Sequence, residues 1–206
     1  MKIPILYEDQ WLLIADKPAG LLVIPTPKNE THTLTGLLNR ELIEKKISYR
    51  LHPCHRLDRD TSGLIIYAKG KMPQKKMMDA FKDRMIRKTY VAFVQGKLPE
   101  SYGEIRIPIE ERSALTAYKV IRQGKGFSVV EVKPSTGRKN QIRIHFKRIG
   151  NPVLGETKFA FRRDFNIKAK RLCLHATALE FTHPITGQKI RVESGLPEKM
   201  LELLKA

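Results

Sequence analysis

The chain has 206 residues, 41% of them hydrophobic and 7% aromatic, a composition typical of a soluble globular protein with a sizeable core. It carries 39 lysines and arginines against 21 acidic residues, a formal net charge of +18, which favours a polyanionic partner such as nucleic acid over a charge that only aids solubility. The sequence holds no long apolar run, targeting segment or CxxC pair, so we expect a cytoplasmic protein without membrane contact or a disulfide framework.

The first elements predicted along the chain are two strands and a helix. A strand over residues 11–16 ends at the turn-forming residues 17–20, and residues 21–24 are predicted to form a second short strand. The helix that follows takes Thr31 or Thr33 as its N-cap and is expected to be purely structural. Its apolar face comprises Leu34, Leu37, Leu38 and Leu42.

A loop over residues 55–63 combines two aspartates and two arginines within a few positions and precedes a short apolar strand, residues 64–68. Side chains at i and i+2 of an extended loop share a side, so Arg56, Asp58 and Asp60 are expected to face one way. Nearby cations favour an ionised carboxylate, which suits a nucleophile or an electrostatic stabiliser. The alternative is a surface turn with solvated ion pairs.

Just before this loop, three potential metal ligands fall within four residues: His52, Cys54 and His55. A metal site needs further ligands at a suitable spacing, and no matching pair follows in the sequence. Pro53 also stiffens the segment. We therefore expect no metal here.

A second amphipathic helix is predicted over residues 73–87, with an apolar stripe expected to face the core. Its outer face is basic and includes Lys75 and Lys76, which makes it a candidate surface for following phosphates beside the 55–63 loop. Simple solvation of these lysines is the alternative. The stripe comprises Met77, Met78, Phe81 and Met85.

A strand over residues 88–96 follows, with Tyr90 near its start, where a side chain can project into a cleft or pack as an ordinary tyrosine. Residues 115–121 and 127–132 are predicted to form a hairpin through a glycine-containing turn. A cationic segment over residues 134–145 then leads into a helix. This arrangement of a turn, exposed N–H groups and arginines suits an anion, either an RNA phosphate or a carboxylate of the same protein.

The remaining elements are closing strands over residues 172–181 and 189–192 and a last helix after Pro197. Met200, Leu201 and Leu204 are expected to face inward from this helix. The elements together predict one α+β domain with a mixed, mostly antiparallel sheet, flanking helices and a central basic cleft.

Four segments of the chain resemble motifs of the RluA-type pseudouridine synthases. Each motif is short, but the presence of all four in the family's order and spacing, in a strongly basic chain, makes the resemblance specific. A turn over residues 151–155 (Asn-Pro-Val-Leu-Gly) also resembles the family. The four segments are residues 16–20 (Asp-Lys-Pro-Ala-Gly), 55–63 (His-Arg-Leu-Asp-Arg-Asp-Thr-Ser-Gly), 88–90 (Lys-Thr-Tyr) and 136–145 (Thr-Gly-Arg-Lys-Asn-Gln-Ile-Arg-Ile-His).

The resemblance implies that Asp58 is the catalytic aspartate and acts on a uridine in RNA. Arg143 would pair with Asp58 and hold it ionised, and Tyr90 would lie against the target ring. Arg56 would enter the space left when the uridine swings out of its stack. The other RNA-binding residues that we expect are His55, Arg138, Asn140, Gln141, Lys75 and Lys76.

The implied reaction breaks the N1–C1′ bond of uridine, turns the uracil and joins its C5 to C1′. A carboxylate stabilises the electron-poor sugar carbon or adds covalently, so neither metal nor organic cofactor is expected. Asn140 departs from the family, which often has histidine there, but it keeps hydrogen-bonding capacity.

Residues 1–206 are expected to form a single catalytic domain without an accessory N-terminal RNA-binding domain. We expect a monomer that acts on transfer RNA, ribosomal RNA or both. Two alternatives belong to other classes: an RNA-binding protein that has lost the chemistry, and a metal-dependent RNA hydrolase using His52, His55, Asp58 and Asp60.

Overall fold

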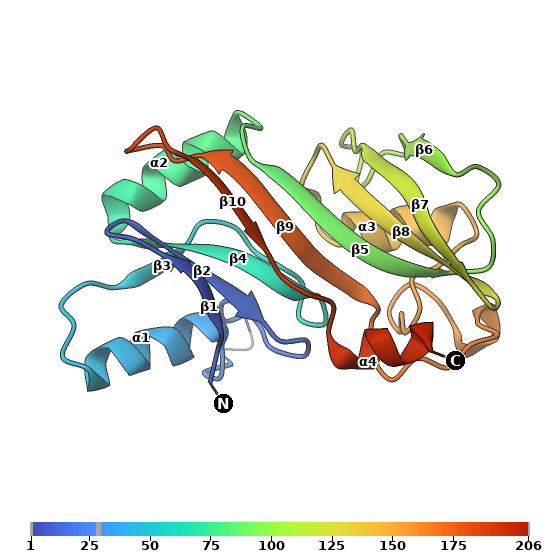
Figure 1. Cartoon of the computed structure of the whole chain (residues 1–206), viewed down its shortest axis with the longest axis horizontal. Coiled ribbons are helices and arrows are strands. Elements are labelled where there is room, and N and C mark those ends of the chain that lie inside the picture. The colour runs from blue at the N-terminus through green and yellow to red at the C-terminus, as the bar shows by residue number, and fades with distance from the viewer. Residues whose placement is uncertain (1, 28–29, 206) are drawn as a thin grey trace. The chain divides into compact units, whose positions relative to one another are not determined.

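The structure, a computed structural model, describes residues 2–27 and 30–205 (Figure 1). The chain forms two compact units, Met1–Ile86 with Ala178–Ser194, and Arg87–Thr177 with Gly195–Ala206. Strand β9 (Leu174–Thr182) contributes its first half to the second unit and its second half to the first. Hydrogen bonds link the strands in the order β1-β2-β4-β9-β5-β8-β7-β6, with β10 on β9 and β3 on β4.

The first unit is built around a strand that is buried on both faces. Residues 64–68 of β4 are fully buried, as their unbroken apolar run predicts. Antiparallel pairs join β1 to β2, β2 to β4, β3 to β4 and β10 to β9. The strands assigned wholly to this unit are β1 (Ile5–Glu8), β2 (Leu12–Lys17), β3 (Leu51–Pro53), β4 (Ser62–Lys69) and β10 (Lys189–Glu193).

Two helices, α1 (Leu34–Glu44) and α2 (Lys71–Lys82), pack on different parts of this sheet (Figure 1). Thr33 caps α1 as predicted, and its side chain accepts a hydrogen bond from the Gly36 N–H at 3.1 Å. The α1 helix reaches β4 through a contact between the hydroxyl groups of Thr35 and Tyr67 at 3.0 Å. The α2 helix packs on an apolar cluster to which β2, β4, β9 and β10 all contribute.

The prediction for α2 was wrong at its C-terminal end and on part of its apolar stripe. The helix ends at Lys82, because Arg84 takes a positive φ of 58° that turns the chain toward the next strand. Met77 is fully buried, but Met78 and Met85 are 52% and 60% exposed. Successive helical residues are rotated by about 100°, so Met78 leaves the stripe that Met77 occupies, and Met85 lies beyond the helix.

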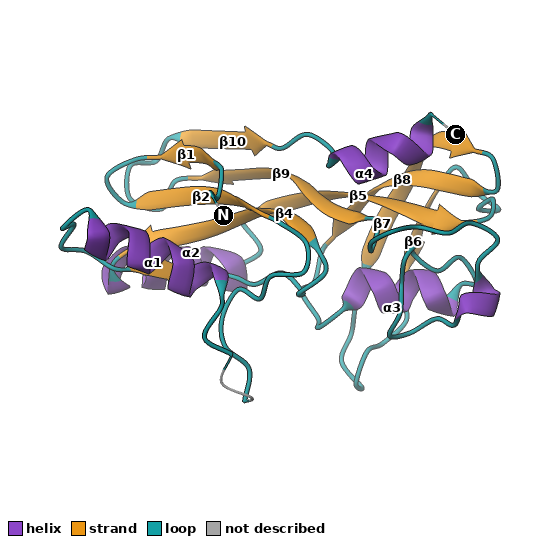
Figure 2. Cartoon of the chain, turned by 90° about the horizontal axis from the view of Figure 1, so that it is seen from below, coloured by secondary structure: helices purple, strands orange, loops and turns teal. Residues whose placement is uncertain are grey.

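The second unit is a sheet with a helix on each side (Figure 2). Helix α3 (Gln141–Arg148) packs on one face through Ile142 and Phe146, beside the alternate β5 residues 92 and 94. Met200 of α4 (Glu198–Leu201) packs with Phe93, which points to the other face. The strands assigned wholly to this unit are β5 (Arg87–Gln95), β6 (Tyr102–Ile105), β7 (Thr116–Gly124) and β8 (Phe127–Pro134).

The predicted hairpin is confirmed as β7 and β8, which pair antiparallel across the expected glycine turn. Antiparallel pairs also join β5 to β8 and β6 to β7. Three short strands were missed, β1, β3 and β6, because each is too short to show a clear alternation of apolar residues. Residues 21–24, predicted as a strand, form only an isolated bridge from Leu22 to Thr33. Leu201 is 41% exposed, not inward as expected.

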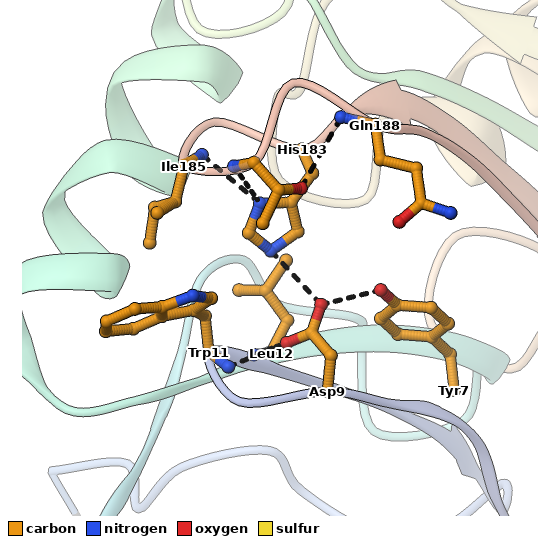
Figure 3. A network of polar contacts seen from close by, with 8 residues as sticks. Tyr7, Asp9, Trp11, Leu12, His183, Ile185 and Gln188 are labelled. Atoms are coloured by element: carbon orange, nitrogen blue, oxygen red, sulfur yellow. Dashed lines mark hydrogen bonds and ion pairs between the residues drawn. The ribbon is translucent and has the colours of Figure 1, made fainter.

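A carboxylate in the first unit ties the turn between β1 and β2 to the turn after β9 (Figure 3). Asp9 accepts hydrogen bonds from the N–H groups of Trp11 and Leu12, both at 2.7 Å, and from the Tyr7 hydroxyl at 2.6 Å. Its Oδ2 also lies 3.2 Å from Nε2 of the buried His183. Burial raises the pKa of Asp9, but these hydrogen bonds outweigh it and bring the pKa below its ordinary value.

Replacing Asp9 by alanine is expected to reduce the free energy of unfolding by about 2–3 kcal/mol, because two backbone N–H groups lose their acceptor. Urea denaturation measures this loss, with Asp79→Ala on the exposed side of α2 as control. Because the folded pKa of Asp9 is lowered, its stabilisation is present above the ordinary value of 3.8 and is lost as the pH falls through the folded pKa. Equal stability of the two variants would contradict this role.

Within the described residues, none of the helices has the length and apolar content required to cross a lipid bilayer.

Candidate active site

The loop that carries Asp58 leads from β3 into β4 in the first unit. Leu57 is buried and anchors the loop, while the flanking Arg56 is exposed and Asp58 is partly exposed. A hydrogen bond from the Thr61 N–H to the Asp58 carbonyl, 3.2 Å long, closes the turn before β4. The Asp58 carboxylate is therefore carried by an anchored loop rather than by a loose surface segment.

A fully buried lysine holds the residue that follows Asp58. Lys17, at the end of β2, donates from Nζ to the carbonyl oxygens of Pro18 at 2.9 Å, Leu21 at 2.7 Å and Arg59 at 2.9 Å. The Gly20 N–H donates to the same Arg59 oxygen at 2.9 Å. The Asp-Lys-Pro-Ala-Gly segment thus fixes the backbone of the Asp58 loop through its charged side chain.

Replacing Lys17 by methionine, a side chain of similar length without a charge, is expected to lower the free energy of unfolding by about 3 kcal/mol. The reason is that three carbonyl groups lose the charged donor to which they are hydrogen-bonded. Urea denaturation measures the loss of stability, and a turnover assay at a temperature where the variant stays folded measures the effect on the Asp58 loop. Lys97→Met, at an exposed lysine, is the control and should change stability by less than about 0.5 kcal/mol. A stable variant with full turnover would remove Lys17 from this role.

His55 makes contacts inside the first unit. Its Nε2 accepts a hydrogen bond from the Ile66 N–H of β4 at 3.0 Å, and its ring lies 4.8 Å from the ring of Phe81 on α2. Gln74 of α2 donates to the Pro53 carbonyl at 3.0 Å. These contacts hold α2 beside the segment that leads into the Asp58 loop. Lys75 and Lys76 are both exposed on this helix.

In the second unit, Tyr90 lies near the start of β5 opposite Val132 of β8. It is half-buried and packs against the same apolar cluster as Ile142 and Phe146 of α3. Tyr90 therefore belongs to the α3 side of this sheet, as does Arg143 from α3 itself.

Arg143 is held in a buried two-point ion pair. Its Nε donates to Glu156 Oε2 at 2.6 Å and its Nη2 to Glu156 Oε1 at 2.7 Å, while Nη1 donates to Asn140 Oδ1 at 3.1 Å. The side chains of Arg143 and Glu156 are only 5% and 0% exposed. The ring of Phe159 lies 5.3 Å from the guanidinium carbon. Such a geometry fixes the plane of the guanidinium group.

Glu156 remains a carboxylate in this buried position. Burial raises the pKa of Glu156, but the hydrogen bonds and charge of Arg143, together with the N–H groups of Lys158 and Phe159, bring it below the ordinary value. These N–H groups donate to Oε1 at 2.7 Å and 3.2 Å. Glu156 orients Arg143 by binding Nε and Nη2 of its guanidinium group. The short motif around Arg143 does not predict this ion pair.

Gln141 shapes the turn before α3. Its Oε1 accepts from the Thr136 hydroxyl at 2.7 Å and the Arg138 N–H at 3.0 Å, and its Nε2 donates to the Leu115 carbonyl and the Thr116 hydroxyl, both at 2.9 Å. The side chain is 4% exposed, and these four contacts use both acceptor positions and both donors of the amide. Gln141 therefore holds the turn before α3 in place through the backbone of Arg138.

The sequence-predicted residues fall into two sets. His55, Arg56, Asp58, Lys75 and Lys76 belong to the first unit. Tyr90, Arg138, Asn140, Gln141 and Arg143 belong to the second. Within each unit the structure gathers residues that are far apart in the sequence. The ion pair expected between Asp58 and Arg143 stays a prediction.

Two residues of the second unit were missed as candidates. Glu156 follows the Asn-Pro-Val-Leu-Gly turn, and the presence of a lone acid next to this turn was the only signal available. Lys88 lies next to Gly137, since a Cβ added at that glycine would sit 3.8 Å from its Nζ. Burial lowers the pKa of Lys88. A lysine in the first positions of a strand gives no sign of such burial.

The segment with His52, Cys54 and His55 shows no arrangement suited to a metal. Among residues 2–27 and 30–205, no three His, Cys, Asp or Glu side chains form a group that could hold a metal ion. Burial raises the pKa of the Cys54 thiol to about 12, so the thiolate that a metal prefers is disfavoured.

A sequence model of the family described as RNA pseudouridylate synthase matches residues 11–148. The dual-specificity RNA pseudouridine synthase RluA of Haemophilus influenzae is 34% identical, with 90% of each chain covered. The tRNA pseudouridine synthase C of Haemophilus ducreyi is 32% identical, with 97% of this chain and 93% of that protein covered. The solved structure of human RNA Pseudouridylate Synthase Domain Containing 4 has the same fold, with a TM-score of 0.81, 23% identity, and coverage of 98% and 91%.

Proposed function

Because this chain belongs to the RNA pseudouridylate synthase family, whose reaction is an isomerisation, we propose that it converts uridines of transfer RNA, ribosomal RNA or both into pseudouridine. The observation that carries the proposal is the match of the family model across both the Asp58 loop and the Arg143 helix. The names of two relatives, one dual-specificity and one acting on tRNA, support these substrates.

The isomerisation is balanced without any other reactant. The N1–C1′ bond of uridine breaks, the uracil turns and a C5–C1′ bond forms. The proton on C5 leaves to solvent, and N1 ends the reaction carrying a proton. The reaction therefore calls for a group that stabilises the sugar carbon, a group against the ring and a means of moving protons.

We assign these tasks to three side chains. Asp58 stabilises C1′ or bonds to it, since it is a partly exposed carboxylate on an anchored loop. Tyr90 lies against the uracil ring and helps the proton steps. Arg143, held by Glu156 and Asn140, is the cation that keeps Asp58 ionised.

The uridine reaches Asp58 only after it leaves its stack, at a cost of a few kcal/mol that is smallest in an RNA loop. Arg56, exposed two positions before Asp58, fills the vacated space. Arg138 and Asn140 contact the RNA from the turn before α3. His55 and Gln141 act indirectly, because their ring and amide groups hold the protein's own backbone.

The test of this function uses RNA that carries tritium on uracil C5, incubated with the protein in the presence of a chelator. Isomerisation releases tritium to water and leaves the strand whole. A metal-dependent hydrolase would cut the strand and be stopped by the chelator, and a pure RNA-binding protein would release nothing. Sequencing cellular RNA for pseudouridine with and without the protein would then identify the uridines.

Replacing both Lys75 and Lys76 by alanine is expected to weaken RNA binding about equally for all sequences. The slope of log affinity against log salt should fall by about 1.4–1.8, since each phosphate contact contributes about 0.7–0.9. Fluorescence anisotropy across a salt series measures this slope. An unchanged slope would remove α2 from the RNA surface.

We further propose that residues 1–206 act as one catalytic domain in the cytoplasm, as a monomer and without a metal or organic cofactor. Light scattering on a sizing column tests the monomer, and full tritium release in the presence of chelator tests independence from metal.

A further inference from the structure

A strongly basic segment follows the Arg143–Glu156 pair in the second unit. Residues 158–171 hold six lysines and arginines and a single acid, Asp164. Five of these cations are exposed together with an aromatic residue, although none of them was among the expected site residues. The exposed residues are Lys158, Phe161, Arg162, Arg163, Lys168 and Lys170, together with Asn166.

Phe161 is the outward-facing aromatic of this segment. It is 68% exposed, whereas Phe159 and Phe165 are partly buried. The guanidinium carbon of Arg163 lies 5.2 Å from the centre of the Phe161 ring. Exposure of a large apolar ring next to two arginines gives no advantage to folding. An exposed ring can instead stack on a base, and the arginines can neutralise phosphates.

The tip formed by Phe161, Arg162 and Arg163 is held in place. The Phe161 N–H donates to Asp164 Oδ2 at 2.8 Å, and the Asp164 N–H donates back to the Phe161 carbonyl at 2.9 Å. Lys147 of α3 also donates to Asp164 Oδ2 at 2.7 Å. Lys147, which lies outside the segment, thus pairs with Asp164, the one acid of the segment. The tip therefore presents a net positive charge.

Both ends of the segment are fixed as well. At the start, the N–H groups of Lys158 and Phe159 donate to Glu156, which holds Arg143, and the Phe159 ring lies against Arg143. At the end, residues 165, 167 and 169 pack into the apolar cluster around Phe93. The tip therefore begins two residues beyond a direct contact of Arg143.

We propose that the tip Phe161-Arg162-Arg163 binds an unpaired stretch of the substrate RNA near the target uridine, with Phe161 stacked on a base and the arginines on phosphates. This inference rests on the proposed function. Cations and an exposed ring suit a single strand of RNA, because its bases and phosphates are both accessible. A duplex offers mainly phosphates.

The stacking is tested with two substitutions of one residue. Phe161→Ala should weaken binding to a labelled stem–loop RNA with a uridine-rich loop by about tenfold, because base stacking on an aromatic side chain is worth that order of affinity. Phe161→Trp should restore it. A fully paired duplex RNA is the second probe, and its affinity should change little with either substitution. Equal affinity of Phe161→Ala and wild type for the stem–loop would overturn the stacking.

The charges are tested with Arg162→Ala/Arg163→Ala. This variant should reduce the salt slope for the stem–loop by about 1.4, because each contact to a single strand contributes about 0.7. The matched control removes the same charge at the C-terminal end of α1, where Arg40→Ala/Lys45→Ala changes an exposed arginine of the helix and its exposed C-cap lysine. Equal slopes for the two double variants would show that only total charge matters and would overturn the assignment of the tip.

Tritium release separates this inference from the function on which it rests. The expected result is release by the wild type and a raised KM with nearly unchanged kcat for Phe161→Ala. Identical tritium release by wild type and Phe161→Ala would contradict RNA binding by the tip and would still support pseudouridine formation. Wild-type protein that binds the stem–loop through Phe161 and releases no tritium would overturn the function while leaving the RNA contact.

Discussion

Asp58→Asn should abolish tritium release, lowering turnover by about 10³-fold or more, because the amide neither attacks the sugar carbon nor carries the charge that stabilises it. The substitution keeps the size of the side chain and removes one negative charge from a partly exposed position. RNA affinity should therefore stay the same or rise slightly. Single-turnover release and fluorescence anisotropy, measured on the same preparation, separate chemistry from binding.

The matched control for this variant is Asp60→Asn, two positions away on the same loop. It makes the same chemical change at another half-buried aspartate. The expected result is turnover within about tenfold of wild type, since only Asp58 is assigned to the reacting sugar. Full activity of Asp58→Asn, or equal loss in both variants, would reassign the catalytic carboxylate.

The second large effect is expected at Glu156. Its replacement by alanine leaves the buried guanidinium of Arg143 without its anion, which should cost about 3–5 kcal/mol of the free energy of unfolding. Urea denaturation measures this loss. Glu41→Ala breaks an exposed ion pair with Lys45 and is the matched control, with an expected loss below about 1 kcal/mol. A similar, small loss in both variants would show that the Arg143–Glu156 pair is not what holds this part of the unit.

Orientation of Arg143 can be distinguished from stability with a milder change. Glu156→Gln keeps one acceptor oxygen and the side-chain volume, so the variant should fold well enough for assay. If Glu156 positions Arg143, single-turnover release should still fall and its dependence on pH should shift. If Glu156 is merely structural, release by the folded variant should match wild type across the pH range.

The pH dependence of stability follows from the same pair. The folded pKa of Glu156 lies below its ordinary value of 4.5, so its stabilisation is complete above that value and is lost as the pH falls through the folded pKa. Glu156→Gln should therefore show a weaker acid dependence of the free energy of unfolding than wild type between about pH 5 and the acid transition. Identical slopes in that range would contradict the assignment.

Local sequence was sufficient for much of the architecture. The Thr33 cap, the buried run of β4 and the β7–β8 hairpin were all predicted, because capping, apolar runs and glycine turns are interactions between near neighbours. The α2 helix was located, but its C-terminal end and part of its buried face were predicted wrongly. The end depends on the left-handed backbone of Arg84, and the burial of each side chain depends on its contact with the sheet. Four short motifs in order were also enough to predict the family.

The sequence by itself determined the strong positive charge, the order of most of the elements and the family to which the chain belongs. Only the tertiary structure decided that Lys17, a charged residue in a turn motif, is fully buried, and that Glu156 is the anion bound to Arg143. Both residues exchange water for partners that lie elsewhere in the chain. Burial of a charge is stable only when such partners converge on it, and that convergence is a property of the folded chain.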